Sequence, residues 1–299
     1  MEKLLVPLDV PVAKRNLYLK NINLLTKNTG RLFLFAGDQR VEHLNDDFYG
    51  EGIPADDASP EHMFRIAASS RVGGFATQLG LIARYGASYP KVPYIVKLNS
   101  KSNIIPESQS DPYSAAWFDV REVVEFARQS KLTIPAVGYT VYLGSTFEAA
   151  MLREAAQIVW QAHQAGLAAI IWVYPRGKSV VNKYDAHLIA GAVNVGTALG
   201  ADFIKVNRPD PMSAEALSEI ISAAGRTQVL FAGGTTIDSV DLLSSIYSQV
   251  HRFGAGGAAL GRNIHQHSLK EAIALANAVA AVIYDGQAPE AARRFLTKN

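Results

Sequence analysis

Short apolar runs alternate with longer segments of helical periodicity along most of the chain. Eight of these runs are rich in apolar and β-branched residues, as expected for strands that are covered on both faces. They occupy residues 31–38, 73–78, 92–99, 134–141, 168–175, 201–207, 228–234 and 257–263. This alternation is typical of a parallel sheet built from βα units.

Helical segments fit between the later strands. Five are defined by apolar residues at helical spacing, over 147–165, 186–199, 213–224, 238–249 and 268–284. The first three are each followed by a glycine (Gly166, Gly200 and Gly225), which is a common residue at the end of a helix. The pattern therefore predicts helical crossovers between the strands.

Eight such units can close into a (β/α)₈ TIM barrel, and a doubly wound open sheet is the alternative. No G-x-G-x-x-G follows the first strand, and the eighth ends in a Gly-Arg turn, which favours the barrel. A length of 299 residues is normal for one barrel. We expect one domain over 1–299, with 1–30 as an N-terminal extension. The polar loop 44–60 is either a substrate-binding lid or an irregular insertion.

Composition limits the kinds of binding partner and the cellular location that we expect for the protein. Hydrophobic residues make up 48% of the chain, which provides for a large core. The balance of 29 basic and 27 acidic residues argues against nucleic acid or an anionic membrane as a partner. The absence of cysteine excludes disulfides, thiolate metal sites and a cysteine nucleophile. The chain begins without a signal-peptide pattern and has no apolar run of membrane-spanning length, so we expect a cytoplasmic protein.

Candidate chemistry follows from the barrel, whose active sites lie at the carboxyl ends of the strands. The residues expected there are Asp38, Gln78, Lys97, Tyr139, Trp172, Tyr174, Lys205, Gly233, Gly234, Gly261 and Arg262.

Lys205 and Lys97 both end apolar strands, where an amine is costly unless it is paired or neutral. Each is therefore either a structural ion pair or a nucleophile that forms a Schiff base with a carbonyl substrate. Burial and a nearby cation such as Arg208 would lower the pKa of Lys205 and favour the nucleophile. The spacing alone leaves the choice between the two lysines open.

Tyr174 and Trp172 share one face of their strand, and Asp38 ends the first strand. A phenol beside a Schiff base can act as a general acid and base, although aromatic residues at strand ends also serve packing. Asp38 either orients a substrate hydroxyl, assists the dehydration of a carbinolamine, or caps a helix.

Two glycine-rich turns, at 231–236 and 259–263, end the last two strands. Their backbone N–H groups can bind a phosphate, and Arg262 can add a bidentate contact. Arg176, close after Tyr174, is a further candidate contact. The alternative is that these turns are structural.

A metal site assembled from Glu42, His43, His265 and His267 lacks any recognised ligand spacing. We therefore expect no metal and no cofactor.

Five segments, VGYTVYLGS, IIWVYPRG, GADFIKV, FAGG and GRN, occur in the order found in a known family. The chain resembles the archaeal-type class I fructose-bisphosphate aldolases and the related aminodideoxyheptulosonate synthases and autoinducer thiolases. The resemblance covers roughly 30–285 and is densest over 134–263. The 31-residue spacing from Tyr174 to Lys205 matches the acid–base tyrosine and Schiff-base lysine of the family, which favours Lys205 over Lys97. Asp38 and Trp172 fall on its first-strand aspartate and its substrate-site tryptophan.

The resemblance implies a metal-independent lyase of glycolysis and carbohydrate metabolism that acts on a small phosphorylated carbonyl compound and forms homo-oligomers. Two departures bear on the substrate. Asp38-Gln39-Arg40 replaces Asp-His-Gly, and Gly233-Gly234-Thr235-Thr236 replaces Gly-Gly-x-Lys, which weakens the case for a second phosphate. The alternatives are transaldol or acyl transfer on a sugar phosphate, and a non-catalytic phosphosugar-binding barrel.

Overall fold

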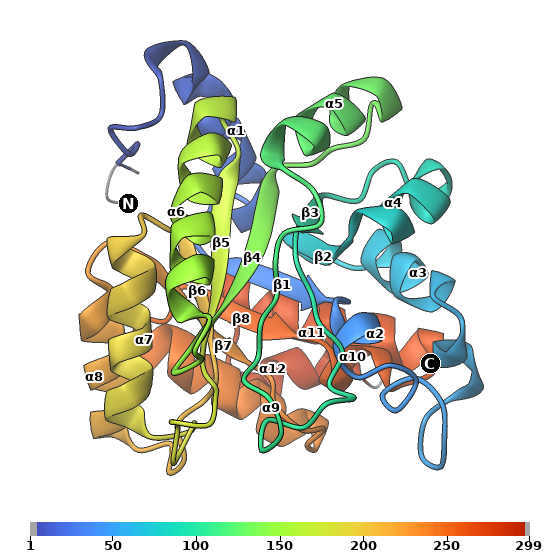
Figure 1. Cartoon of the computed structure of the whole chain (residues 1–299). Coiled ribbons are helices and arrows are strands. Elements are labelled where there is room, and N and C mark those ends of the chain that lie inside the picture. Colours follow the sequence, from blue (N-terminus) through green and yellow to red (C-terminus); the bar gives the residue numbers. More distant parts are fainter. Residues whose placement is uncertain (1–4, 297–299) are drawn as a thin grey trace.

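The computed structural model describes residues 5–296, in which eight parallel strands close into a barrel (Figure 1). Each strand pairs with the next in the chain, and β1 also pairs with β8. The strands are β1 (Leu32–Ala36), β2 (Gly74–Gln78), β3 (Tyr94–Lys97), β4 (Ala136–Leu143), β5 (Ala168–Pro175), β6 (Phe203–Val206), β7 (Gln228–Ala232) and β8 (Gly257–Leu260). The predicted (β/α)₈ fold is confirmed, and each strand lies within its predicted run or overlaps it.

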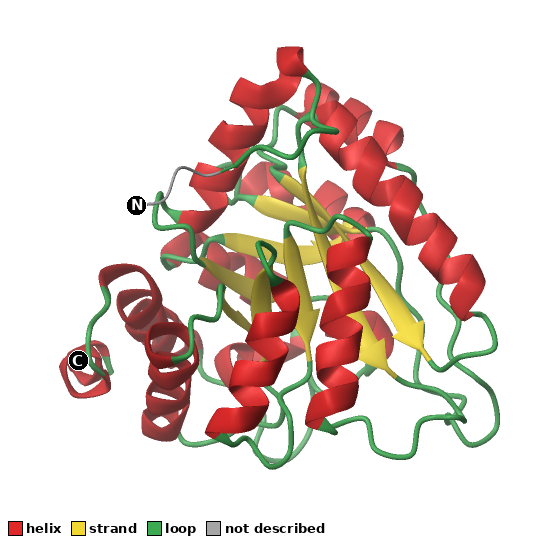
Figure 2. Cartoon of the chain, turned by 90° about the vertical axis from the view of Figure 1, so that its left-hand side faces the viewer, coloured by secondary structure: helices red, strands yellow, loops and turns green. Residues whose placement is uncertain are grey.

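Helices surround the strands on the outside of the barrel (Figure 2). The α-helices are α1 (Arg15–Thr26), α2 (Gln39–Glu42), α3 (Glu61–Ser69), α4 (Leu79–Tyr85), α5 (Val120–Ser130), α6 (Glu148–Ala165), α7 (Ala186–Ala198), α8 (Ala214–Ala224), α9 (Ser239–Tyr247), α10 (Arg262–His265), α11 (Leu269–Asp285) and α12 (Pro289–Ala292). The helix expected over 238–249 ends at Tyr247 as an α-helix and continues as a π-helical turn, Ser248–Arg252.

Residues 5–30, the described part of the N-terminal extension, contribute to the core. In α1, Tyr18, Ile22 and Leu25 are buried in the same apolar cluster as Leu32 and Leu34, inside the barrel. Because these side chains cover the amino-terminal end of the barrel, access to its interior is left to the carboxyl ends of the strands.

The segment 44–60 is held against α10. Asp57 and His265 are both fully buried, and their side chains are 2.6 Å apart. Arg40 donates to the backbone oxygen of Asp57 at 2.6 Å, and its guanidinium lies 3.9 Å from the ring centre of Phe48. In this structure the segment packs against α10, and no residue of 44–60 is among the lining residues of the cavity described below.

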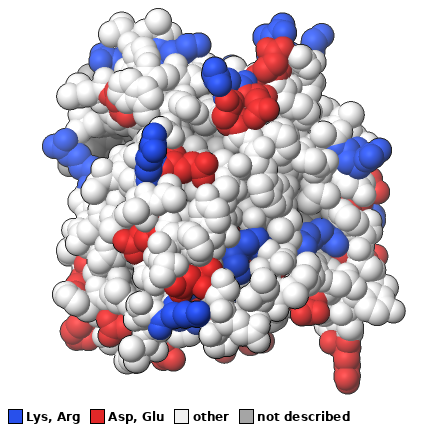
Figure 3. Space-filling model, in the orientation of Figure 1, with Lys and Arg blue, Asp and Glu red and all other residues white. Residues whose placement is uncertain are grey.

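Charged residues are dispersed over the face shown in Figure 3, where Lys and Arg alternate with Asp and Glu. None of the described helices has the length and the apolar character needed to span a membrane.

Candidate active site

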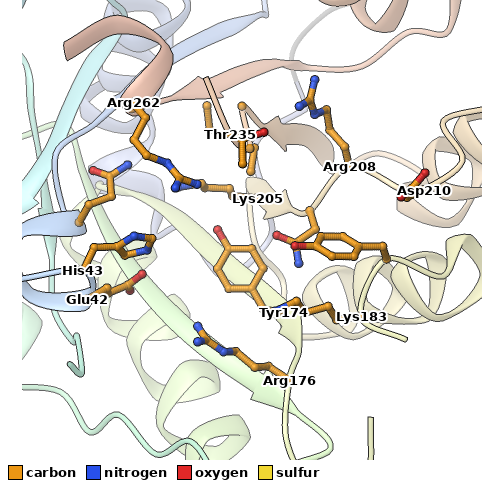
Figure 4. A pocket seen from close by; sticks show the side chains of 18 of the residues that line it. Glu42, His43, Tyr174, Arg176, Lys183, Lys205, Arg208, Asp210, Thr235 and Arg262 are labelled. Atoms are coloured by element: carbon orange, nitrogen blue, oxygen red, sulfur yellow. The ribbon is translucent and has the colours of Figure 1, made fainter. Parts of the chain in front are cut away.

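A cavity of about 580 Å³ opens at the carboxyl ends of the strands (Figure 4). Asp38, Tyr174, Lys205 and Arg262 all line it, as the strand-end positions predict. The cavity is also lined by Arg176, Gly233, Gly234 and Gly261. Side chains from several different strands therefore meet around one space.

Trp172 lies beneath this cavity and does not line it. The residue is 1% exposed, and it pairs in register with Lys205 across β5 and β6. Its ring lies against Gly138 of β4, where an added Cβ would be 2.4 Å from the indole. A glycine at this position is what allows the indole to pack directly against the backbone of β4.

Two amines share this indole. The Nζ atoms of Lys97 and Lys205 each lie 5.2 Å from the ring centre of Trp172. Lys97 is fully buried, donates to the backbone oxygen of Asn99 at 2.7 Å, and lies 3.8 Å from Asp38 Oδ2. Burial lowers the pKa of Lys97, although the charge of Asp38 opposes this effect.

Lys205 differs from Lys97 in both partners and access. It lines the cavity, and within residues 5–296 its amine has no hydrogen bond and no ion pair. Geometry thus favours Lys205 as the amine that can meet a ligand, independently of the family spacing.

Tyr174 projects into the same cavity, and Figure 4 shows its phenol oriented toward Lys205. Burial raises the pKa of Tyr174 well above its usual value, and the charges of Glu42 and Asp38 raise it further. The hydroxyl is therefore protonated at neutral pH. It can donate a proton, or exchange one with a strongly basic group that forms during a reaction.

The turn after β7 is built around glycine. Gly234 has φ +70°, and an added Cβ would lie 2.8 Å from Nη2 of Arg208. The amide of Asn263 donates to the backbone oxygens of Gly233 and Thr235, and its oxygen accepts from the backbone N–H of Ile237. Asn263 thereby fixes the turn after β7 against the turn after β8.

Cations lie on two sides of the cavity. Arg262 is 3.7 Å from Asp47, which also pairs with His43 at 3.0 Å. Arg208 lines the cavity beside Gly234, and burial lowers its pKa. Arg176 pairs with Glu107 and donates to Asn103 at 3.2 Å.

Several strand-end residues lie away from the cavity. Gln78 donates to the backbone oxygen of Asp38 at 3.1 Å, and the hydroxyl of Tyr139 donates to Glu154 at 2.5 Å. His265, one of the histidines considered above as a metal ligand, instead contacts Asp57 in the buried pair described above. In the part of the chain that the structure describes, no three metal-ligating side chains are grouped as a metal site.

The sequence pattern did not indicate that residues within 39–43 line the cavity. Gln39, Glu42 and His43 line it, as do Asn103 and Lys183. Glu42 and His43 entered the analysis only as weak metal ligands. The spacing of Glu42 four residues after Asp38 is a signal that could have placed both carboxyl groups on one side of a helical turn.

Comparison with known proteins identifies relatives over nearly the full length. Residues 32–267 match the family model described as DeoC/LacD family aldolase. The chain is 52% identical to the fructose-bisphosphate aldolase/6-deoxy-5-ketofructose 1-phosphate synthase of Methanocaldococcus jannaschii, over 97% of this chain and 93% of that protein.

Two solved structures share the fold and much of the sequence. A fructose-bisphosphate aldolase from Slackia heliotrinireducens has a TM-score of 0.96 and 46% identity, covering 99% of this chain and 94% of that one. An archaeal fructose-1,6-bisphosphate aldolase, with its catalytic lysine covalently bound to the carbinolamine intermediate, has a TM-score of 0.77 and 31% identity. It covers 89% of this chain and 99% of the other. The chain belongs to the DeoC/LacD family of aldolases.

Proposed function

We propose that this protein is a class I aldolase that reversibly cleaves a phosphorylated ketose through a Schiff base on Lys205. The observation that carries the proposal is an unpaired amine at the carboxyl end of β6, facing a cavity that also contains a phenol and an arginine-lined rim. A protein that only binds phosphosugars has no use for an amine buried to 6% exposure without a partner.

The reaction begins when neutral Lys205 adds to the ketone of the substrate and water leaves, giving an iminium. The iminium withdraws electrons from the adjacent C–C bond, so that the bond breaks and an enamine forms. The phenol of Tyr174 takes the proton from the hydroxyl of the departing aldehyde as it passes its own proton to a neighbouring carboxylate, and the same relay in reverse later protonates the enamine. Asp38 positions substrate hydroxyls or assists the dehydration. Trp172 supports the amine from below.

We assign the phosphate to the two glycine turns. Gly233, Gly234 and Gly261 present backbone to the cavity, and Arg262 adds a charge-assisted contact. Arg176 is a second candidate contact, on the opposite side of Tyr174 in Figure 4.

The substrate class is narrowed by the two activities in the name of the M. jannaschii relative. Both names describe ketose phosphates, and the second describes a compound with one phosphate. Thr236 stands where a lysine is common in the family. The proposal therefore requires that the site bind one phosphate of the substrate, and it does not depend on a contact to a second phosphate. Fructose 1,6-bisphosphate remains the first compound to test.

The proposal also covers the metabolic pathway, the cellular location and the oligomeric state. We place the enzyme in carbohydrate metabolism, with glycolysis as the pathway, in the cytoplasm and as a homo-oligomer, on the basis of the family resemblance. Transaldol or acyl transfer by the same Schiff base is the second candidate, because the same amine and phenol serve it. Product analysis separates the two, and light scattering measures the oligomer.

The test is reduction with borohydride in the presence of dihydroxyacetone phosphate. We expect a stable adduct on Lys205, and we expect Lys205→Met to remove both the adduct and turnover. Lys97→Met is the control for the rival amine. An adduct found on Lys97 would contradict the site assignment, and the absence of any adduct and any turnover would favour a binding protein.

A further inference from the structure

Glu42 is a second carboxyl group at the mouth of the barrel. It is the last residue of α2, and Asp38 precedes the first residue of the same helix. One helical turn separates the two carboxyl groups, and both residues line the cavity. Figure 4 shows the Glu42 side chain next to that of His43, with both on one side of Tyr174.

The two carboxyl groups differ in their partners. Asp38 lies 3.8 Å from the amine of Lys97 and is 3% exposed. Within the described residues, the side chain of Glu42 has no hydrogen bond and no ion pair, although its backbone oxygen accepts from the N–H of Asn103 at 3.0 Å. The carboxyl of Glu42 is therefore open to a ligand in the cavity.

Charged and titratable groups face Glu42 from every neighbouring element. They are Asp38 after β1, Lys97 on β3, Lys101 after β3, Tyr142 on β4, Tyr174 on β5, Arg176 after β5, Lys205 on β6 and His43 after α2. Burial raises the pKa of Glu42, and the charge of Asp38 raises it further, while the lysines and His43 act in the opposite direction. The net result is a carboxyl group that holds its proton to higher pH than an exposed glutamate does.

We propose that Glu42 is a catalytic acid that gives its proton to the hydroxyl of the carbinolamine on Lys205 as water leaves. The proposal rests on the proposed function. It divides the work between the two carboxyl groups: Asp38, beside Lys97, orients substrate hydroxyls, and Glu42 carries the proton.

The amine of Lys205 forms the C–N bond, the carbonyl π electrons move to oxygen, and the amine proton is transferred to that oxygen. The nitrogen lone pair then forms the C=N bond while the C–O bond breaks. The departing oxygen takes the proton of Glu42 and leaves as water. The iminium and the new carboxylate carry opposite charges within one partly buried space, which stabilises both.

The experiment follows iminium formation and not overall turnover. Wild type and Glu42→Gln are mixed with dihydroxyacetone phosphate, quenched with borohydride at set times, and measured by intact mass. We expect the rate of adduct formation to fall about 10²-fold or more in Glu42→Gln, because general acid catalysis contributes that much. The half-saturating concentration of dihydroxyacetone phosphate should change little.

Control variants test whether the acidic proton of Glu42 is what the rate depends on. Glu51→Gln makes the same change at an exposed position close in sequence and should leave the rate unchanged. Glu42→Asp retains an acid and should keep part of the wild-type rate. In wild type the rate should fall on the alkaline side as Glu42 loses its proton, and Glu42→Gln should lack this decline.

The outcomes distinguish the two proposals. A wild-type rate in Glu42→Gln overturns the role of Glu42 and leaves the Schiff base on Lys205 intact. Equal losses of rate and affinity, or a lowered melting temperature, would assign Glu42 a structural role and also overturn it. If Glu42→Gln does not fold, a wild-type rate that shows no alkaline decline decides against the proposal. No adduct in wild type means that the proposed function itself fails.

Discussion

Both ends of the barrel contain buried ionisable groups, but the two ends differ in whether these groups have hydrogen-bond or ion-pair partners. At the amino-terminal end, His163 lies 2.7 Å from Asp9 and 3.2 Å from Asp202, and Tyr18 donates to Asp202 at 2.5 Å. The backbone N–H of Ala169 also donates to Asp202. Every member of this network has a partner.

At the carboxyl end, the network is incomplete. Lys97 is held by Asp38 and Asn99, whereas the side chains of Lys205 and Glu42 face the cavity without a hydrogen bond or an ion pair among the described residues. A buried polar group without a partner costs stability, so such groups are retained where they act on a ligand. In the proposed function, the amino-terminal network stabilises the fold, and the groups at the carboxyl end act on the substrate.

The largest expected effect separates the two tyrosines. Tyr174→Phe should lower kcat by about 10²–10⁴-fold with little change in the melting temperature, because the phenol has no hydrogen-bond partner in residues 5–296. Tyr18→Phe should leave kcat almost unchanged and lower the free energy of unfolding by about 1–3 kcal/mol, because it removes a hydrogen-bond donor to Asp202. Steady-state kinetics and thermal unfolding of both variants test this contrast. A strongly destabilised Tyr174→Phe would erase it.

A second effect concerns Arg262, at the rim of the cavity. Arg262→Ala should raise KM for fructose 1,6-bisphosphate by about 10–100-fold and change kcat less, because a charge-assisted hydrogen bond to phosphate is worth about 1.5–3 kcal/mol in ground and transition states alike. Arg226→Ala, at an exposed position, is the control. An unchanged KM would place the phosphate elsewhere.

A smaller effect is the pH dependence of stability that the amino-terminal network creates. Burial lowers the pKa of His163, but the hydrogen bonds and charges of Asp202 and Asp9 outweigh it and raise the value to about 9. The unfolded chain binds this proton only below about pH 6.5. The stabilisation is therefore complete below about pH 6.5 and is lost as pH rises through 9.

Urea unfolding at pH values across this range measures the effect. Wild type should lose stability as the pH rises, and His163→Gln should show a flatter profile over the same range. The kcat of His163→Gln should match that of wild type at any pH where both are folded. A parallel decline in both proteins would assign the pH dependence to other groups.

The last prediction is that removal of metal ions has no effect on turnover. Exhaustive chelation should leave turnover unchanged, because the iminium serves as the electron sink and the described residues offer no grouped metal ligands. Loss of activity that zinc restores would contradict the Schiff-base chemistry as the source of catalysis.

The regular parts of the barrel were predictable because each strand is covered on both faces and each is bounded by turn residues. The same periodicity placed Asp38, Tyr174, Lys205 and Arg262 at strand ends, and the structure places them around one cavity. Distinguishing Lys205 from Lys97 required either the family spacing or the hydrogen bond to Asn99, because the local sequence patterns of the two lysines are equivalent.

The remaining features depend on contacts between distant segments. The pairing of Asp57 with His265 spans 208 residues, so no local pattern in 44–60 indicates that this segment supports α10. Glu42 was considered only as a metal ligand and not placed at the cavity, because a short helix of four residues leaves no periodicity to detect. The closed amino-terminal network likewise joins three segments that are separate in sequence.

The packing of α1 across the end of the barrel also bears on synthesis by the ribosome. The helix α1 and Asp9 precede all the strands in the chain, yet Tyr18 and Asp9 bond to residues 184 and 154 positions later. Contacts with such long sequence separation form slowly, because a long loop must close before they contribute. We therefore expect α1 to remain undocked on the nascent chain, with its apolar face uncovered, until β6 has emerged, so that a segment translated before every strand is among the last to dock.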